Sequence, residues 1–97
     1  MITLKSDNLL GYLGKLPSEV LLIFASPLCA ICKEVVPKIE EKLGDTITLL
    51  YIDGDQWDEI SEQYNIDYYP TVIYLIDGEE KKRIARVNSK TINKILK

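Results

Sequence analysis

The sequence feature that most constrains the fold is an unbroken apolar run at residues 20–25, Val-Leu-Leu-Ile-Phe-Ala. A strand that is apolar on both faces must be covered on both faces, as in the sheets of α/β proteins. Residues 47–52 and 71–76 are further segments of strand character, and helical patterns separate the three. Strands that alternate with helices predict parallel pairing through right-handed crossovers. The pattern therefore predicts an α/β sandwich with helices on both faces of a sheet.

Three segments show the helical spacing of apolar residues. Ser6 is the expected N-cap of the first helix and Pro17 ends it, with an apolar stripe formed by Leu9, Leu10, Leu13 and Leu16. The second helix ends before Gly44 and is expected to bury Val35, Val36, Ile39 and Leu43. The third is a short amphipathic helix with Trp57, Ile60 and Tyr64 turned inward.

The C-terminal part adds a hairpin and a last helix. Asp77-Gly78 is a strong hairpin signal, and residues 81–87 alternate loosely, as an exposed edge strand does. Ser89 is the expected cap of a final helix that buries Ile92, Ile95 and Leu96. With residues 2–4 as a short first strand, the predicted order is β-α-β-α-β-α-β-β-α. This order predicts a three-layer α/β/α sandwich with a mixed sheet, and 97 residues predict a single domain over residues 1–97.

Composition narrows the class of function. The net charge of −3 argues against nucleic acid as a main partner, and no apolar run approaches the length of a membrane span. The N-terminal residues lack the features of a signal peptide, so we expect a cytoplasmic, reducing compartment. Residues 44–80 carry ten acids and no bases, whereas residues 81–97 carry seven bases and no acids. This split fits two solvated faces with a lysine-protected edge strand, or alternatively a surface that docks a partner.

The two cysteines carry the chemistry. Cys29 and Cys32 enclose only Ala30 and Ile31, and a disulfide that closes so small a loop stabilises a fold little. Cys29 lies where the buried strand ends and a helix begins, and the N-terminus of a helix favours the thiolate, which is the nucleophile. Cys32 lies nearly one turn further on the same side, where it can attack a mixed disulfide held on Cys29. The pattern predicts a thiol–disulfide oxidoreductase with Cys29 as nucleophile and Cys32 as resolving cysteine.

Two other roles for the cysteines remain open at this point. Structural zinc needs four nitrogen or sulfur ligands, and this chain has two thiols and no histidine, so only a dimer that shares four thiols, or an unusual site with carboxylate ligands, would complete a zinc site. We therefore expect no metal. Free cysteines are also often small buried apolar residues without chemistry.

The segment from Phe24 to Lys33 resembles the active-site segment of the thioredoxin family. Pro37 stands where that family has a proline in the helix, and Tyr69-Pro70-Thr71 is similar to its cis-proline loop. The resemblance implies the thioredoxin-like fold, with a mixed, centrally parallel sheet. It also implies that Pro70 is cis and lies against the cysteine pair, in the groove that receives a substrate backbone.

From this resemblance we expect substrate contacts at Leu28, Tyr68, Tyr69 and Pro70. It further implies a redox-active disulfide with no other cofactor. The implied partners are disulfide-containing protein substrates and a reductase that donates electrons. We expect a monomer that binds neither nucleic acid nor membrane.

The chain departs from the family pattern beside the cysteines. Leu28 replaces the usual tryptophan, Ile23 replaces a buried acid that helps to deprotonate the resolving cysteine, and Tyr51 replaces the lysine partner of that acid. These departures leave a non-catalytic binding or adaptor module as the alternative function. The absence of histidine beside Cys29 predicts a reductase-leaning potential. Such a potential is closer to that of the reducing members of the family, about −270 mV, than to that of its strong oxidants, about −120 mV.

Overall fold

The computed structural model describes residues 1–96. Along the chain it contains β1 (Ile2–Thr3), α1 (Leu9–Leu13), β2 (Glu19–Ala25), α2 (Ala30–Leu43), β3 (Thr48–Asp53), α3 (Asp58–Gln63), β4 (Thr71–Ile76), β5 (Glu79–Ile84) and the 3-10 turn η1 (Ile92–Lys94). The strands form one sheet in the order β1-β3-β2-β4-β5. Strands and helices alternate as the sequence pattern predicts.

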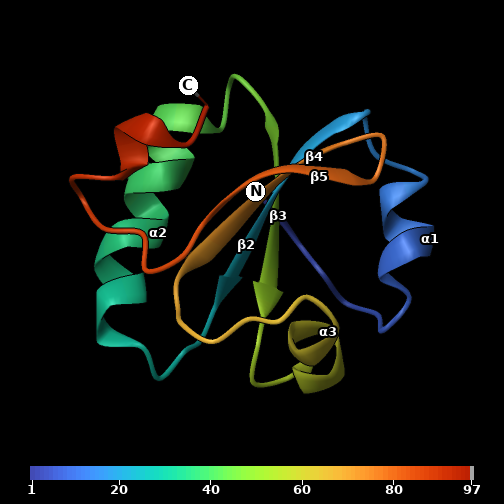
Figure 1. The fold of residues 1–97 in the computed structure, drawn as a ribbon, viewed down its shortest axis with the longest axis horizontal. Coiled ribbons are helices and arrows are strands. Elements are labelled where there is room, and N and C mark those ends of the chain that lie inside the picture. The colour runs from blue at the N-terminus through green and yellow to red at the C-terminus, as the bar shows by residue number, and fades with distance from the viewer. Residues whose placement is uncertain (97) are drawn as a thin grey trace.

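The sheet is mixed, and its direction changes beside the central strand. β1, β3 and β2 are parallel, whereas β4 runs antiparallel to β2 and β5 runs antiparallel to β4. The mixed sheet is confirmed, but the expectation of parallel pairing for the strand after the third helix is wrong. A parallel crossover must carry the chain back along the sheet. The short α3 instead lies at the carboxyl end of β3, so the chain enters β4 from that same end (Figure 1).

Helices cover both faces of the sheet. Figure 1 shows α2 and η1 together on one face, with α1 and α3 on the other. On β2, Leu21, Ile23 and Ala25 pack toward the α2 face, and Val20, Leu22 and Phe24 pack toward the opposite face. This alternation confirms that β2 is a strand buried on both faces. Within residues 1–96, no helix combines the length and apolar character that a membrane span requires.

Three details of the helices differ from the sequence predictions. Asn8, not Ser6, caps α1, because its side chain accepts a hydrogen bond from the Gly11 amide at 3.0 Å. Leu10 is 77% exposed, since a helix this short buries only one narrow stripe. At the C-terminus, Asn88 rather than Ser89 accepts hydrogen bonds from the following amides.

The last segment is a 3-10 turn instead of a full α-helix. Its apolar residues Ile92 and Ile95 nevertheless enter the core beside α2. Short helices are marginal on their own, so packing of these two side chains decides the local geometry. The hairpin after Asp77 is confirmed, with β5 beginning at Glu79 instead of residue 81 and forming an edge of the sheet.

Candidate functional site

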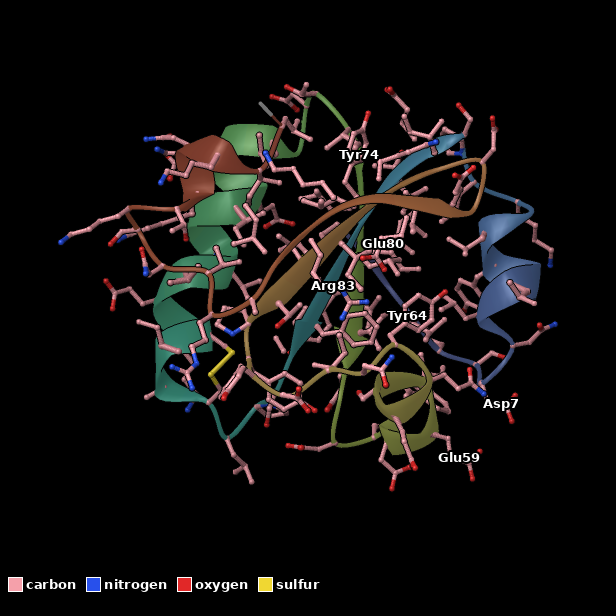
Figure 2. The ribbon with its side chains drawn as sticks, in the orientation of Figure 1. Asp7, Glu59, Tyr64, Tyr74, Glu80 and Arg83 are labelled. Atoms are coloured by element: carbon pink, nitrogen blue, oxygen red, sulfur yellow. A yellow bond between two sulfur atoms is a disulfide. The ribbon has the colours of Figure 1, made fainter. Side chains whose placement is uncertain are left out.

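The two cysteines lie at the carboxyl end of β2, where α2 begins. Cys29 is the N-cap of α2 and Cys32 lies in its first turn. Their sulfurs are joined in a disulfide, with 5.3 Å between the two Cα atoms; Figure 2 shows this bond as the yellow link at the start of α2. Cys29 is partly exposed, whereas Cys32 is only 3% exposed. Of the two cysteines, Cys29 is therefore the more accessible from solvent.

The start of α2 is arranged to stabilise negative charge on Cys29. The Cys32 amide donates a hydrogen bond to the Cys29 sulfur at 3.2 Å. The first amides of a helix lack partners within the helix and carry a partial positive charge. In the reduced protein, the same amide and the dipole of this 14-residue helix act on a Cys29 thiolate.

The Tyr69–Pro70 segment lies against the cysteine pair. The Tyr69–Pro70 peptide bond is cis. The Cys29 sulfur lies 3.9 Å from the Tyr69 carbonyl oxygen, and both side chains contact the core on the α2 face. The antiparallel pairing of β4 with β2 creates this proximity, because it places the first residue of β4, Thr71, opposite Phe24 near the end of β2. The expected cis-proline beside the cysteines is confirmed.

The other two residues expected to contact substrate are chain neighbours of Cys29 and Tyr69. Leu28 is 91% exposed immediately before Cys29, and Tyr68 is 46% exposed immediately before Tyr69. A hollow of about 330 Å³ lies between the start of α2 and the segment after β5, lined by Ile31, Tyr68, Tyr69, Arg86, Val87 and Asn88. The exposed surface around Cys29 therefore combines apolar, aromatic and cationic side chains.

Sequence reasoning missed Arg86. Its guanidinium carbon lies 3.6 Å from the centre of the Tyr68 ring, a cation–π stack. The two residues are 18 positions apart, and no local pattern joins them. Only the arrangement of the strands brings the segment after β5 beside the cis-proline loop, where the Val87 amide donates to the Pro70 carbonyl at 2.9 Å.

Sequence reasoning also missed the support beneath the cysteine loop. The buried Ser26 hydroxyl donates to the Asp55 carboxylate and accepts from the Leu28 amide at 3.1 Å. The Ser26 carbonyl accepts from the Cys29 amide at 3.1 Å. These contacts tie the loop before α2 to the loop after β3. A serine before a proline is a turn signal, but nothing in the sequence identifies its distant carboxylate partner.

The inner side of Cys32 has no acidic residue where the sequence comparison expects one. Ile23 is fully buried, and its partner in the β2–β3 register is Tyr51. A small hollow of about 210 Å³ includes Cys32, Ser26 and Tyr51 among its lining residues. Burial, and next the charges of Asp53 and Asp55, raise the pKa of Tyr51 above its ordinary value. Tyr51 therefore stays protonated at neutral pH and does not serve as the missing base.

Metal ligands do not gather around the thiols. Among residues 1–96, no group of three or more histidine, cysteine, aspartate or glutamate side chains is placed to hold a metal ion. The two sulfurs are the soft ligands of this site, and they are bonded to each other. The arrangement is that of a dithiol–disulfide pair at the N-terminus of a helix, next to a cis-proline loop.

Comparisons with known proteins agree with this geometry. The sequence model of the thioredoxin family matches residues 1–97. Thioredoxin of Mycoplasmoides gallisepticum is 35% identical over 82 residues, which are 81% of this chain and 82% of that protein. Thioredoxin of Bacillus subtilis is 36% identical over 63 residues, which are 62% of this chain and 61% of that protein. The chain belongs to the thioredoxin family.

Solved structures show the same fold. The Plasmodium falciparum thioredoxin structure superposes with a TM-score of 0.87 at 19% identity and covers 99% of this chain and 96% of that chain. A Schistosoma mansoni thioredoxin structure has a TM-score of 0.82 at 27% identity, with 98% and 88% covered. Some relatives are much longer: the match spans 13% of protein disulfide isomerase-like 1-4 of Arabidopsis thaliana. The thioredoxin-like α/β fold is therefore confirmed.

Proposed function

We propose that the protein is a thiol–disulfide oxidoreductase that exchanges disulfides with protein substrates. The Cys29 thiolate attacks one sulfur of a substrate disulfide, forms a mixed disulfide and releases the other substrate sulfur as a thiolate. The Cys32 thiolate then attacks the Cys29 sulfur, which frees the second substrate thiol and leaves the Cys29–Cys32 disulfide. Two electrons pass from the protein to the substrate, whose two released thiolates take up protons.

One observation carries this proposal: the two sulfurs are within bonding reach, with Cys29 partly exposed and Cys32 buried behind it. The partly exposed sulfur of Cys29 is accessible to a protein disulfide, whereas the sulfur of Cys32 is almost closed to solvent and lies next to that of Cys29. This asymmetry supports Cys29 as nucleophile and Cys32 as resolving cysteine. The surface around Cys29 supports Tyr69, Pro70, Leu28 and Tyr68 as substrate contacts.

The cycle needs no cofactor beyond the protein's own disulfide, but it needs an electron source. A reductase must return the Cys29–Cys32 disulfide to the dithiol after each turnover. A reducing compartment such as the cytoplasm supplies such electrons, and we place the protein there as a monomer that acts as a single domain over residues 1–97. Because no histidine stabilises the Cys29 thiolate, we place the potential toward the reducing end of the family.

The test combines turnover with trapping. The reduced protein, recycled by dithiothreitol, is expected to precipitate insulin chains faster than dithiothreitol alone. Cys32→Ser is expected to hold substrate proteins as mixed disulfides that dithiothreitol releases. Cys29→Ser is the matched control, because it keeps one thiol at the same turn of α2 but has no exposed nucleophile.

Each other outcome assigns a different function. An inactive protein whose Cys32→Ser variant traps nothing indicates the binding or adaptor module. Zinc bound at one ion per two chains indicates the thiol-bridged dimer. Equilibration in glutathione buffers measures the potential, and a value close to about −120 mV overturns the assignment as a reductase.

A further inference from the structure

The guanidinium of Arg86 is held at the rim of the cysteine site without an anionic partner. It stacks 3.6 Å above the Tyr68 ring, and none of residues 1–96 forms a hydrogen bond or an ion pair with it. Arg83, three residues earlier, is different: it binds both carboxylate oxygens of Glu80 and the Tyr64 carbonyl (Figure 2). Arg83 is thus a structural residue, whereas Arg86 has donors that the fold leaves unused.

The backbone holds Arg86 in an uncommon conformation. Its φ angle is 52°, in the left-handed region that glycine and asparagine adopt most readily. The next residue, Val87, is buried and donates its amide to the Pro70 carbonyl at 2.9 Å. The hydrogen bond to Pro70 and the stack on Tyr68 thus fix the arginine beside the cis-proline loop. The N–H donors of a guanidinium lie in its own plane, so stacking on a ring leaves its edge open to a carboxylate.

The two sides of Tyr69 carry opposite charge. On one side, Tyr69 lines the hollow of about 330 Å³ with Ile31, Tyr68 and Arg86. On the other side it lines a hollow of about 530 Å³ whose charged residues are all acidic, namely Asp55, Asp58, Glu62 and Asp67. A substrate segment that approaches Cys29 beside Tyr69 would therefore have the cationic Arg86 on one side and acidic side chains on the other.

We propose that Arg86 selects substrates in which an acidic side chain lies close to the reactive cysteine, on the Arg86 side of Tyr69. This inference rests on the proposed function and names the substrate class of the same site. The acidic side repels such a side chain, so the preference depends on whether the acid precedes or follows the cysteine. The net charge of −3 predicts the opposite, namely slower reaction with any acidic substrate. The sign of the effect on the reaction rate therefore distinguishes attraction by Arg86 from repulsion by the net charge of the protein.

The probes are short peptides with one cysteine as a mixed disulfide to 2-thiopyridine. Attack by the Cys29 thiolate on the peptide sulfur forms the Cys29–peptide disulfide and releases 2-thiopyridone, which is followed by absorbance. Aspartate, asparagine or lysine is placed directly before or directly after the cysteine. At low salt, we expect aspartate to react about threefold faster than asparagine in one of the two placements, and lysine to react more slowly there. Because the interaction between Arg86 and the peptide aspartate is exposed to solvent, the aspartate-to-asparagine rate ratio should fall toward one in 0.5 M salt, where the screening length is about 4 Å.

Arg86→Gln tests the residue itself and is expected to bring the aspartate-to-asparagine ratio to one. Lys15→Gln is the matched control, because Lys15 is an exposed cation before β2, at the opposite end of that strand from the cysteines. It is expected to leave both the rate and the ratio unchanged. Circular dichroism confirms that both variants are folded.

The inference is wrong if the wild-type protein reacts equally with aspartate and asparagine in both placements. It is equally wrong if Arg86→Gln keeps the preference, because the charge would then come from elsewhere. Failure of the proposed function is a separate result: no peptide would react faster with the protein than with an ordinary free thiol.

Discussion

The absence of an acid behind Cys32 leads to a prediction that the structure makes quantitative. Ile23 and Cys32 belong to the same core cluster, and Tyr51, the register partner of Ile23, lines the hollow beside Cys32. Because paired residues of neighbouring strands point to the same face, a carboxyl group at position 23 would face this region. Ile23→Asp therefore supplies a proton acceptor near the Cys32 thiol, and Ile23→Asn is its near-isosteric control without one.

The expected gain is in the second step of the exchange. Cys32 is 3% exposed, and a thiol in apolar surroundings ionises with difficulty. A positioned general base commonly accelerates such a step by about 10²–10⁴-fold. Ile23 shares a core cluster with Cys32 but does not line the hollow beside it, so we expect a gain below that range. The expected rate is about tenfold that of Ile23→Asn at pH 7, which corresponds to about 1.4 kcal/mol.

Stability moves in the opposite direction. Ile23 is fully buried, so either substitution loses about 3 kcal/mol of apolar packing and about 2 kcal/mol for an unpaired polar group. Burial raises the pKa of the introduced carboxyl above its unfolded value. The aspartate variant is therefore closest in stability to the asparagine variant in acid, and it loses stability relative to that variant as the pH rises through the two pKa values. Urea unfolding at pH 4 and pH 8 measures this difference.

The kinetic assay uses dithiobis(nitrobenzoate) in a stopped-flow instrument. Cys29 releases the first thionitrobenzoate in a step that depends on reagent concentration, and Cys32 releases the second in a step that does not. The aspartate variant should be faster than the asparagine variant only in the second step, and the advantage should disappear below the pKa of the new carboxyl. Equal second-step rates in the two folded variants across pH 5 to 9 would refute the reasoning.

Three further predictions concern single contacts. Asn8→Ala removes the cap of α1 and should cost about 1 kcal/mol, seen as a fall of about 5 °C in the melting temperature by circular dichroism. The hydrogen bond from Arg83 lowers the pKa of Glu80, so the stability that this ion pair contributes is present above the ordinary glutamate pKa and is lost as the pH falls through the lowered value. Glu80→Gln should therefore cost less than about 1 kcal/mol in urea unfolding at pH 7 and nothing at pH 2. An equal loss of stability at both pH values would contradict the ion pair. A methyl group on Gly54 would overlap the Tyr69 hydroxyl, so Gly54→Ala should displace Tyr69 and raise KM for insulin roughly twofold or more, whereas an unchanged KM would remove Tyr69 from the substrate contacts.

Local patterns identified most of the fold because the signals are contained in short stretches of chain. The apolar run of β2 and the helical stripe that includes Val35 and Ile39 indicate their elements without tertiary information. The cap of α1 was less predictable, because Ser6 and Asn8 are both suitable cap residues and lie only two positions apart in the sequence. The final turn was also overestimated, since its helical spacing covers too few residues to form an α-helix alone.

The candidate site divides in the same way. The spacing of Cys29 and Cys32, placed between a buried strand and a helix, indicates the redox chemistry directly, and the resemblance around Pro70 places a proline loop beside them. The side chains that surround the two cysteines could not be predicted from the sequence. Arg86 over Tyr68 and Asp55 beneath Ser26 are contacts between segments far apart in the sequence, and no short pattern encodes them.

The sequence by itself determined which segments become strands and helices, and which two sulfurs react, because hydrophobic periodicity and cysteine spacing act over a few residues. Only the tertiary structure decided the direction of β4, because that depends on where the short α3 leaves the chain relative to the sheet. Through that direction, it also decided what surrounds the sulfurs. The antiparallel pairing of β4 with β2 places Pro70 beside Cys29, and the hydrogen bond from Val87 to Pro70 then places Arg86 at the rim of the site.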